Sequence, residues 1–158
     1  MDLSSYNFIR ANLDTEWNKF IEASPQGTLF SRSEFIGSLN ARPGLWYCYK
    51  NNNIKAALVL IESDDGNSNN FHNLMIYGGV LFKPHDPDQN HAQELSEEFR
   101  ISSASISHLT KTYQNISMVT HPSFADLRPY LWYNYSSDEN TFELDLRYTS
   151  YISLNKKI

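Results

Sequence analysis

The stretch 45-LWYCYKNNNIKAALVLIES-63 predicts a β-hairpin at the centre of the fold. Two β-prone runs, Leu45–Lys50 and Ile54–Glu62, flank three consecutive asparagines at 51–53. Asparagine tolerates the positive φ angles that tight hairpin turns use. The second run is apolar on both faces, so we expect it to lie inside a sheet that is covered on both sides.

Upstream of the hairpin, the sequence predicts two short helices. In DTEWNKFIEAS (14–24), Asp14 is placed to cap a helix whose apolar residues recur at i, i+3 and i+4. In SRSEFIGSLN (31–40), Ser31 and Glu34 have the spacing of a capping box. We therefore expect helices to begin at both positions.

Downstream of the hairpin, the sequence predicts strand, helix and strand in turn. LMIYGGVLF (74–82) predicts a third strand, and apolar residues at helical spacing predict a long helix over 89–113. NISMVTH (115–121) predicts a further strand. TFELDLRYTSYISL (141–154) alternates apolar and charged residues and predicts the last one. This order is typical of a single α/β (α+β) domain over 1–158, with a mixed central sheet flanked by helices.

Composition narrows the class of protein and its setting. The 158 residues are 41% hydrophobic and 20% charged, which suits one domain with a substantial core. A net charge of −5 disfavours broad binding to DNA but allows an anionic small molecule at one local site. The single cysteine excludes an intrachain disulfide, and we find neither a secretory signal pattern nor an apolar run long enough to span a bilayer. We expect a cytoplasmic protein with no membrane span.

Tyr77, Gly78 and Gly79 form the first candidate binding site. Paired glycines in a strand expose backbone amides that can bind an extended substrate or a phosphate. A structural bulge in a tightly packed sheet explains them equally well.

The segment DLRPYLWYNY (126–135) is the second candidate. Pro129 restricts Arg128 to extended geometry, so we expect a strand end or turn followed by a short helical piece. Arg128 offers a planar fork to a carboxylate or phosphate, and Asp126 is close enough in sequence to orient it. Alternatively, Asp126 and Arg128 pair with each other while the aromatic residues pack a second layer.

Two further features have a functional and a structural interpretation. HDPDQNH (85–91) offers imidazole and carboxylate groups to a divalent metal but lacks a fixed ligand geometry. A solvated acidic loop before a helix N-terminus explains it as well, and we predict no metal site. Cys48 lies in the middle of a predicted strand, where a small buried hydrophobe is favoured over a nucleophile.

Several segments together resemble one protein family. DLRPYLWYNY (126–135) followed by LRYTSYISL (146–154) is similar to the paired signature (D)xRPFxW..Y and RYTYxxDL of the Fem family and related transferases of the GNAT superfamily. Segments 24–36, 54–62 and 76–82 resemble further family segments in the same order. The resemblance covers most of the chain. Ser153 stands where the family has an aspartate before its leucine.

The resemblance implies a function. Fem-type proteins attach amino acids from aminoacyl-tRNA to cell-wall precursors, and this chain resembles the first of their two GNAT-like domains. It would bind a small-molecule, sugar-nucleotide or peptide acceptor for N-acyl transfer to an amine. The acyl-CoA loop [QR]-x-x-G-x-[GA] does not occur here, so acyl-CoA or aminoacyl-tRNA is expected as donor only with a second GNAT-like domain.

The site residues follow from both lines of reasoning. The acceptor contacts are expected from Tyr77, Gly78, Gly79, Arg128 and Trp132, and the candidates for a catalytic base are Asp126 and Tyr135. One alternative is a stand-alone GNAT-fold binding or interaction module without turnover. Another is a short GNAT enzyme with an unconventional cofactor loop.

Overall fold

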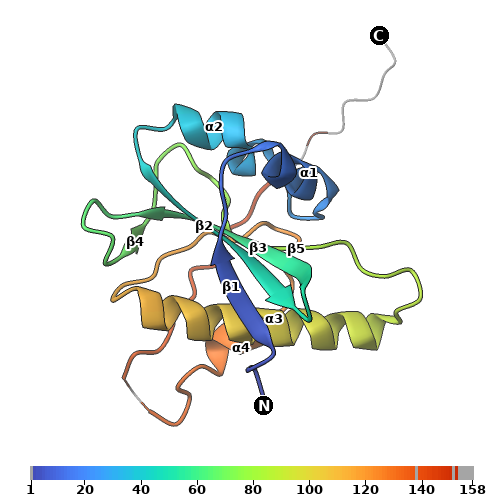
Figure 1. The fold of residues 1–158 in the computed structure, drawn as a ribbon. Coiled ribbons are helices and arrows are strands. Elements are labelled where there is room, and N and C mark those ends of the chain that lie inside the picture. The colour runs from blue at the N-terminus through green and yellow to red at the C-terminus, as the bar shows by residue number, and fades with distance from the viewer. Residues whose placement is uncertain (1, 138, 151, 153–158) are drawn as a thin grey trace.

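A computed structural model describes residues 2–137, 139–150 and 152. Its centre is a five-stranded sheet with helices on both faces, which confirms the predicted α+β class (Figure 1). The strands are β1 (Tyr6–Arg10), β2 (Arg42–Lys50), β3 (Asn53–Glu62), β4 (Asn69–Asn70) and β5 (Gly79–Phe82). The order is β1-β2-β3, and both β4 and β5 pair with the second edge of β3. Among the described residues, all four strand pairs are antiparallel and parallel pairing is limited to two isolated bridges, so the expected mixed sheet is in fact an antiparallel one.

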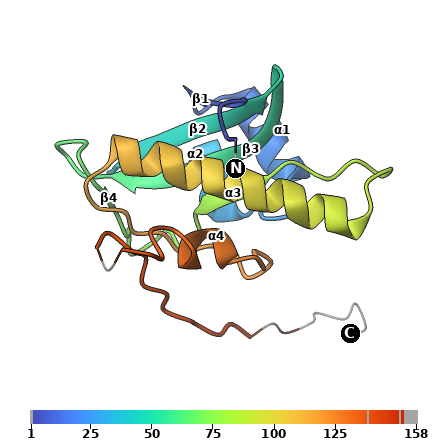
Figure 2. The same cartoon turned by 90° about the horizontal axis from the view of Figure 1, so that it is seen from below.

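The helices form two groups on opposite faces of the sheet. They are α1 (Thr15–Ala23), the 3-10 turn η1 (Leu29–Ser31), α2 (Ser33–Ser38), α3 (His91–Thr112) and α4 (Arg128–Leu131). Helices α1 and α2 cover one face, whereas α3 lies across the other with α4 beneath it (Figure 2). The long helix is therefore confirmed. A short helical piece is also present, but it begins at Arg128, so the extended geometry expected for that residue was wrong.

The central hairpin forms as predicted. Strands β2 and β3 pair antiparallel, and Asn51 and Asn52 adopt φ angles of 50° and 62° at the turn. Alternate residues of the hairpin enter two separate cores. Trp46, Cys48 and Leu58 pack against α3, whereas Leu45, Ala57 and Val59 pack against α1 and α2.

One of the two predicted helix starts is correct. The Asp14 carboxylate accepts a hydrogen bond from the Trp17 amide at 2.9 Å, so the cap of α1 is confirmed. The capping box of Ser31 and Glu34 was wrong, because Ser31 is buried within η1 and the residue before α2 is Arg32. Glu34 instead accepts a bond from the Arg32 side chain at 3.4 Å.

The strand predictions near the C-terminus need correction. Only Gly79–Phe82 of 74–82 is a strand, and 115–121 contributes just two parallel bridges, at Asn115 and Thr120. This segment is held instead by Asn69, whose side-chain amide bonds to both backbone groups of Ser117.

The last predicted strand is wrong where the structure describes it, and strands β1 and β4 were not predicted. Residues 141–150 have no strand pairing, whereas positions 151, 153 and 154 of that prediction lie outside the described residues. Strand β1 was missed because its five residues form an edge strand that is mostly exposed and lacks an apolar run. Across the part of the chain that the structure describes, every helix is too short or too polar to cross a bilayer.

Candidate functional site

The glycine pair lies where two segments meet the sheet. Gly78 bridges in parallel to Thr120, and its amide donates to the Val119 carbonyl at 2.7 Å. A Cβ atom on Gly78 would lie 2.5 Å from Met75 Cε and 2.8 Å from the Val59 carbonyl oxygen. Gly79 follows with a φ of +76°, which other residues rarely adopt. The close approach of Val59 therefore requires glycine at position 78, and the positive φ favours glycine at position 79.

A small hollow of about 20 Å³ borders this pair. That space suits about one water molecule, so an extended substrate could reach the glycines only from its rim. Phe71, His72 and Met75 of the loop between β4 and β5 line this hollow. Phe71, Leu74 and Ile76 of the same loop are all more than half exposed. An apolar loop beside an opening in the sheet is a candidate contact surface for a ligand.

Tyr77 is half-buried and fixes this loop to its neighbours. Its ring packs edge-on against Phe30 of η1, with centroids 6.0 Å apart, and against His121 at 5.3 Å. Burial lowers the pKa of His121. Tyr77 thus joins the glycine loop to the α1 and α2 side of the fold.

The Arg128 side chain is occupied within the protein. Its Nε and Nη2 groups donate to the two oxygens of Asp126 at 2.8 and 2.7 Å, as the local-pair alternative predicts. The guanidinium also lies over Phe99 of α3, 5.3 Å from the ring centre. The bond from Arg128 lowers the pKa of Asp126, and a stabilised carboxylate is a weak proton acceptor.

The two predicted parts of the site lie in different places. Tyr77 packs against η1, whereas Arg128 and Trp132 both pack against Phe99 of α3. Trp132 is 57% exposed and Tyr135 is 82% exposed, so Trp132 could still contact a ligand at this second surface. The aromatic second layer of the alternative interpretation forms only in part, since Tyr130 is buried but these two residues are not.

The other two candidate features have structural roles. His85 pairs with Glu98 at 2.9 Å and His91 approaches Glu94 at 3.5 Å. Within 2–137, 139–150 and 152, no three His, Cys, Asp or Glu residues are grouped to hold a metal ion. Cys48 is fully buried, and burial raises the pKa of its thiol to about 12.

A charged cluster that sequence reasoning missed lies at the opposite end of β3 from the hairpin turn. The side chain of Glu62 is 1% exposed, and its Oε1 accepts hydrogen bonds from Arg10 Nη2 and from the Tyr113 hydroxyl, the latter at 2.6 Å. Arg42 Nε lies 2.8 Å from Oε2 in an ion-pair contact that lacks hydrogen-bond alignment. A single carboxylate ending an apolar strand was the available signal, but its partners come from residues far away in sequence.

Comparison with protein-family models, with curated proteins and with solved structures found no match for this chain.

Proposed function

We propose that this chain is a Fem-type, GNAT-like domain that binds the acceptor in an acyl- or aminoacyl-transfer reaction. The observation that carries the proposal is the opening beside Gly78 and Gly79, where the segment resembling a family strand meets an exposed apolar loop. The α+β class, with helices on both faces of the sheet, agrees with what is expected for a GNAT-like domain. The acceptor is proposed to be a sugar nucleotide or peptide that carries an amine, such as a cell-wall precursor.

The proposed reaction divides between two domains. The acceptor nitrogen attacks the carbonyl carbon of an ester or thioester, a C–N bond forms, and the C–O or C–S bond breaks as the amine loses a proton. Positioning the amine supplies much of the rate enhancement in such a reaction. We assign this positioning to the present chain. We assign binding of the donor, acyl-CoA or aminoacyl-tRNA, to a second GNAT-like domain.

A stand-alone binding module without turnover is the second candidate. It is favoured because two predicted ligand-binding groups are satisfied internally: the Gly78 amide by Val119 and the Arg128 fork by Asp126. Neither candidate base, Asp126 or Tyr135, has a partner arrangement that favours proton transfer. For either function we propose a cytoplasmic setting, since the buried thiol of Cys48 suits a reducing compartment.

Thermal unfolding with ligands tests the proposal. Sugar-nucleotide precursors at ten times their Kd should stabilise the protein by about 1.4 kcal/mol, a rise in Tm of a few degrees. Acetyl-CoA alone should give no rise, whereas a rise would favour the short GNAT enzyme. Phe71→Ser tests the rim of the glycine hollow, and Arg128→Ala tests the second surface. The proposal fails if no precursor stabilises the wild-type protein.

Gly78→Ala tests the close approach on which the opening depends. The added methyl group meets the Val59 carbonyl, so the free energy of unfolding should fall by roughly 1–3 kcal/mol. Gly37→Ala is the matched control, because no atom lies within 4 Å of a Cβ there. Because Gly37 lies within helix α2, Gly37→Ala should instead raise the free energy of unfolding by about 0.5–1 kcal/mol. Urea unfolding measures both, and equal effects would contradict the assigned geometry.

A further inference from the structure

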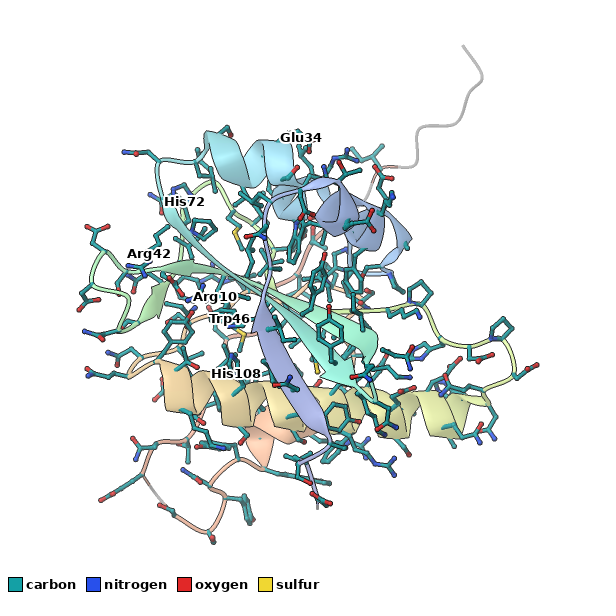
Figure 3. The ribbon with its side chains drawn as sticks, viewed as in Figure 1. Arg10, Glu34, Arg42, Trp46, His72 and His108 are labelled. Atoms are coloured by element: carbon teal, nitrogen blue, oxygen red, sulfur yellow. The ribbon has the colours of Figure 1, made fainter. Side chains whose placement is uncertain are left out.

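Three strand ends bring two arginines to one buried carboxylate. Arg10 is the last residue of β1, Arg42 the first of β2, and Glu62 the last of β3. Arg42 is directly opposite Glu62 in the β2–β3 register, so both side chains lie on the face that α3 covers. Figure 3 shows Arg10 and Arg42 at this end of the sheet, with Trp46 next to Arg10 and His108 on α3 below them.

The cluster carries excess positive charge. One carboxylate, that of Glu62, contacts two guanidinium groups and the Tyr113 hydroxyl, although one arginine fork would satisfy it. The hydroxyl remains protonated, because burial and the bond to Glu62 raise the pKa of Tyr113. The pKa of His108 is lowered mainly by burial and also by the charges of Arg10 and Lys111. These contacts set two guanidinium cations against one carboxylate, in a chain whose net charge is −5.

Both arginines are held in place but keep free donors. Arg10 gives one N–H to Glu62, and its guanidinium lies 3.8 Å from the ring centre of Trp46. Arg42 contacts Glu62 through Nε and the Asp64 carbonyl through Nη1, at 3.5 Å. A guanidinium has five N–H donors, so these contacts use only a minority of them. The arginine side chains are 50% and 55% exposed, which leaves the remaining donors accessible to solvent.

Glu62 and Tyr113 are closely packed against β2 beneath the arginines. A Cβ atom on Gly44 would lie 3.0 Å from Glu62 Cγ and 3.0 Å from the Tyr113 hydroxyl oxygen. Glycine therefore lets Glu62 and Tyr113 approach β2 closely. Groups that are ordered before binding lose little conformational entropy when a ligand arrives.

We propose that Arg10 and Arg42 form a binding site for an oxyanion, the phosphate or carboxylate group of a small molecule, on the solvent side of Glu62. Glu62 and Tyr113 are positioning residues that hold the two guanidinium groups side by side. Trp46 fixes the plane of Arg10. The site is independent of the proposed acceptor surface, which lies at Gly78 and the β4–β5 loop.

Titration with inorganic phosphate, followed by NMR, tests this site. Ionic strength is held constant with sodium chloride, and the indole N–H signal of Trp46 is the reporter because Arg10 stacks on that ring. We expect a saturable shift at millimolar phosphate, with Trp17, which is buried on the opposite face of the sheet, as the unshifted internal control. A parallel titration with acetate separates phosphate from carboxylate recognition. Shifts that equal those in chloride, or that affect all three tryptophans alike, overturn the proposal.

Three variants test whether the arginines bind phosphate or only neutralise the charge of Glu62. Glu62→Gln keeps the side-chain size and one oxygen that can still accept from Arg10, but it removes the competing negative charge, so phosphate should bind about tenfold more tightly. Arg42→Gln should weaken binding about tenfold. Arg42→Lys keeps the charge at an exposed position but loses the fork, and several-fold weaker binding is expected. Unchanged phosphate affinity in Arg42→Gln and Arg42→Lys would assign the arginines a structural role alone.

Discussion

Trp17→Ala is expected to lower the free energy of unfolding by about 3–5 kcal/mol, which is a large part of the stability of a domain of this size. Trp17 is completely buried between α1 and the sheet, where it packs against Tyr47 with ring centroids 5.5 Å apart. Its indole N–H donates to the Ser31 carbonyl at 2.8 Å and so joins α1 to η1. Truncation would remove the ring, leave a cavity and leave the Ser31 carbonyl without its hydrogen-bond donor.

Two control substitutions separate these contributions. Trp17→Phe keeps most of the ring but not the donor, so a smaller loss of about 1–3 kcal/mol is expected from the unpaired carbonyl and the reduced volume. Trp132→Ala removes a ring that is 57% exposed and should cost less than about 1 kcal/mol. Guanidinium unfolding gives all three values. A loss below about 1 kcal/mol for Trp17→Ala would mean that the α1 face of the sheet is not a packed core.

Removing both arginines of the charged cluster is the second large effect. In Arg10→Gln/Arg42→Gln, Glu62 keeps the Tyr113 hydroxyl but loses both cations, and an uncompensated buried charge typically costs about 3–5 kcal/mol. Adding Glu62→Gln removes that charge, so the triple variant should recover most of the loss. Each single arginine substitution should cost less than half of the double one, because the other cation remains.

Urea unfolding of the single, double and triple variants measures this coupling. Recovery in the triple variant would show that the arginines stabilise the fold through the charge of Glu62. A triple variant no more stable than the double would mean instead that their packing, chiefly that of Arg10 on Trp46, matters more. This result bears on stability alone, whereas the phosphate titration bears on binding.

Local chemistry explains why the central elements could be predicted. The hairpin turn needs residues that accept positive φ, and Asn51 and Asn52 provide them. The cap of α1 depends on Asp14 and an amide three residues away. The same argument failed at Ser31, because its burial under Trp17 is a tertiary contact that the capping-box spacing does not reveal. It failed again at β1, an exposed edge strand that exists only through pairing with β2.

In the candidate site, too, contacts between residues close in sequence could be predicted, and contacts between distant segments could not. Sequence spacing was enough to propose a pair between Asp126 and Arg128, two residues apart, and the structure contains that pair. The glycine pair was also identified, but the reason for it, the approach of Val59, required the sheet register. Arg10 and Glu62 are 52 residues apart and Tyr113 is 51 residues beyond Glu62, so no local pattern links them.

The sequence by itself determined the α+β class, the hairpin and the long helix, because these depend on side-chain periodicity and on backbone preferences within a few residues. Only the tertiary structure decided that β1 completes the sheet, that 141–150 has no strand pairing, and that two arginines meet at Glu62. The physical reason is that burial of a charge and pairing of an edge strand are set by which distant segments come together. Those contacts depend on the whole packed fold.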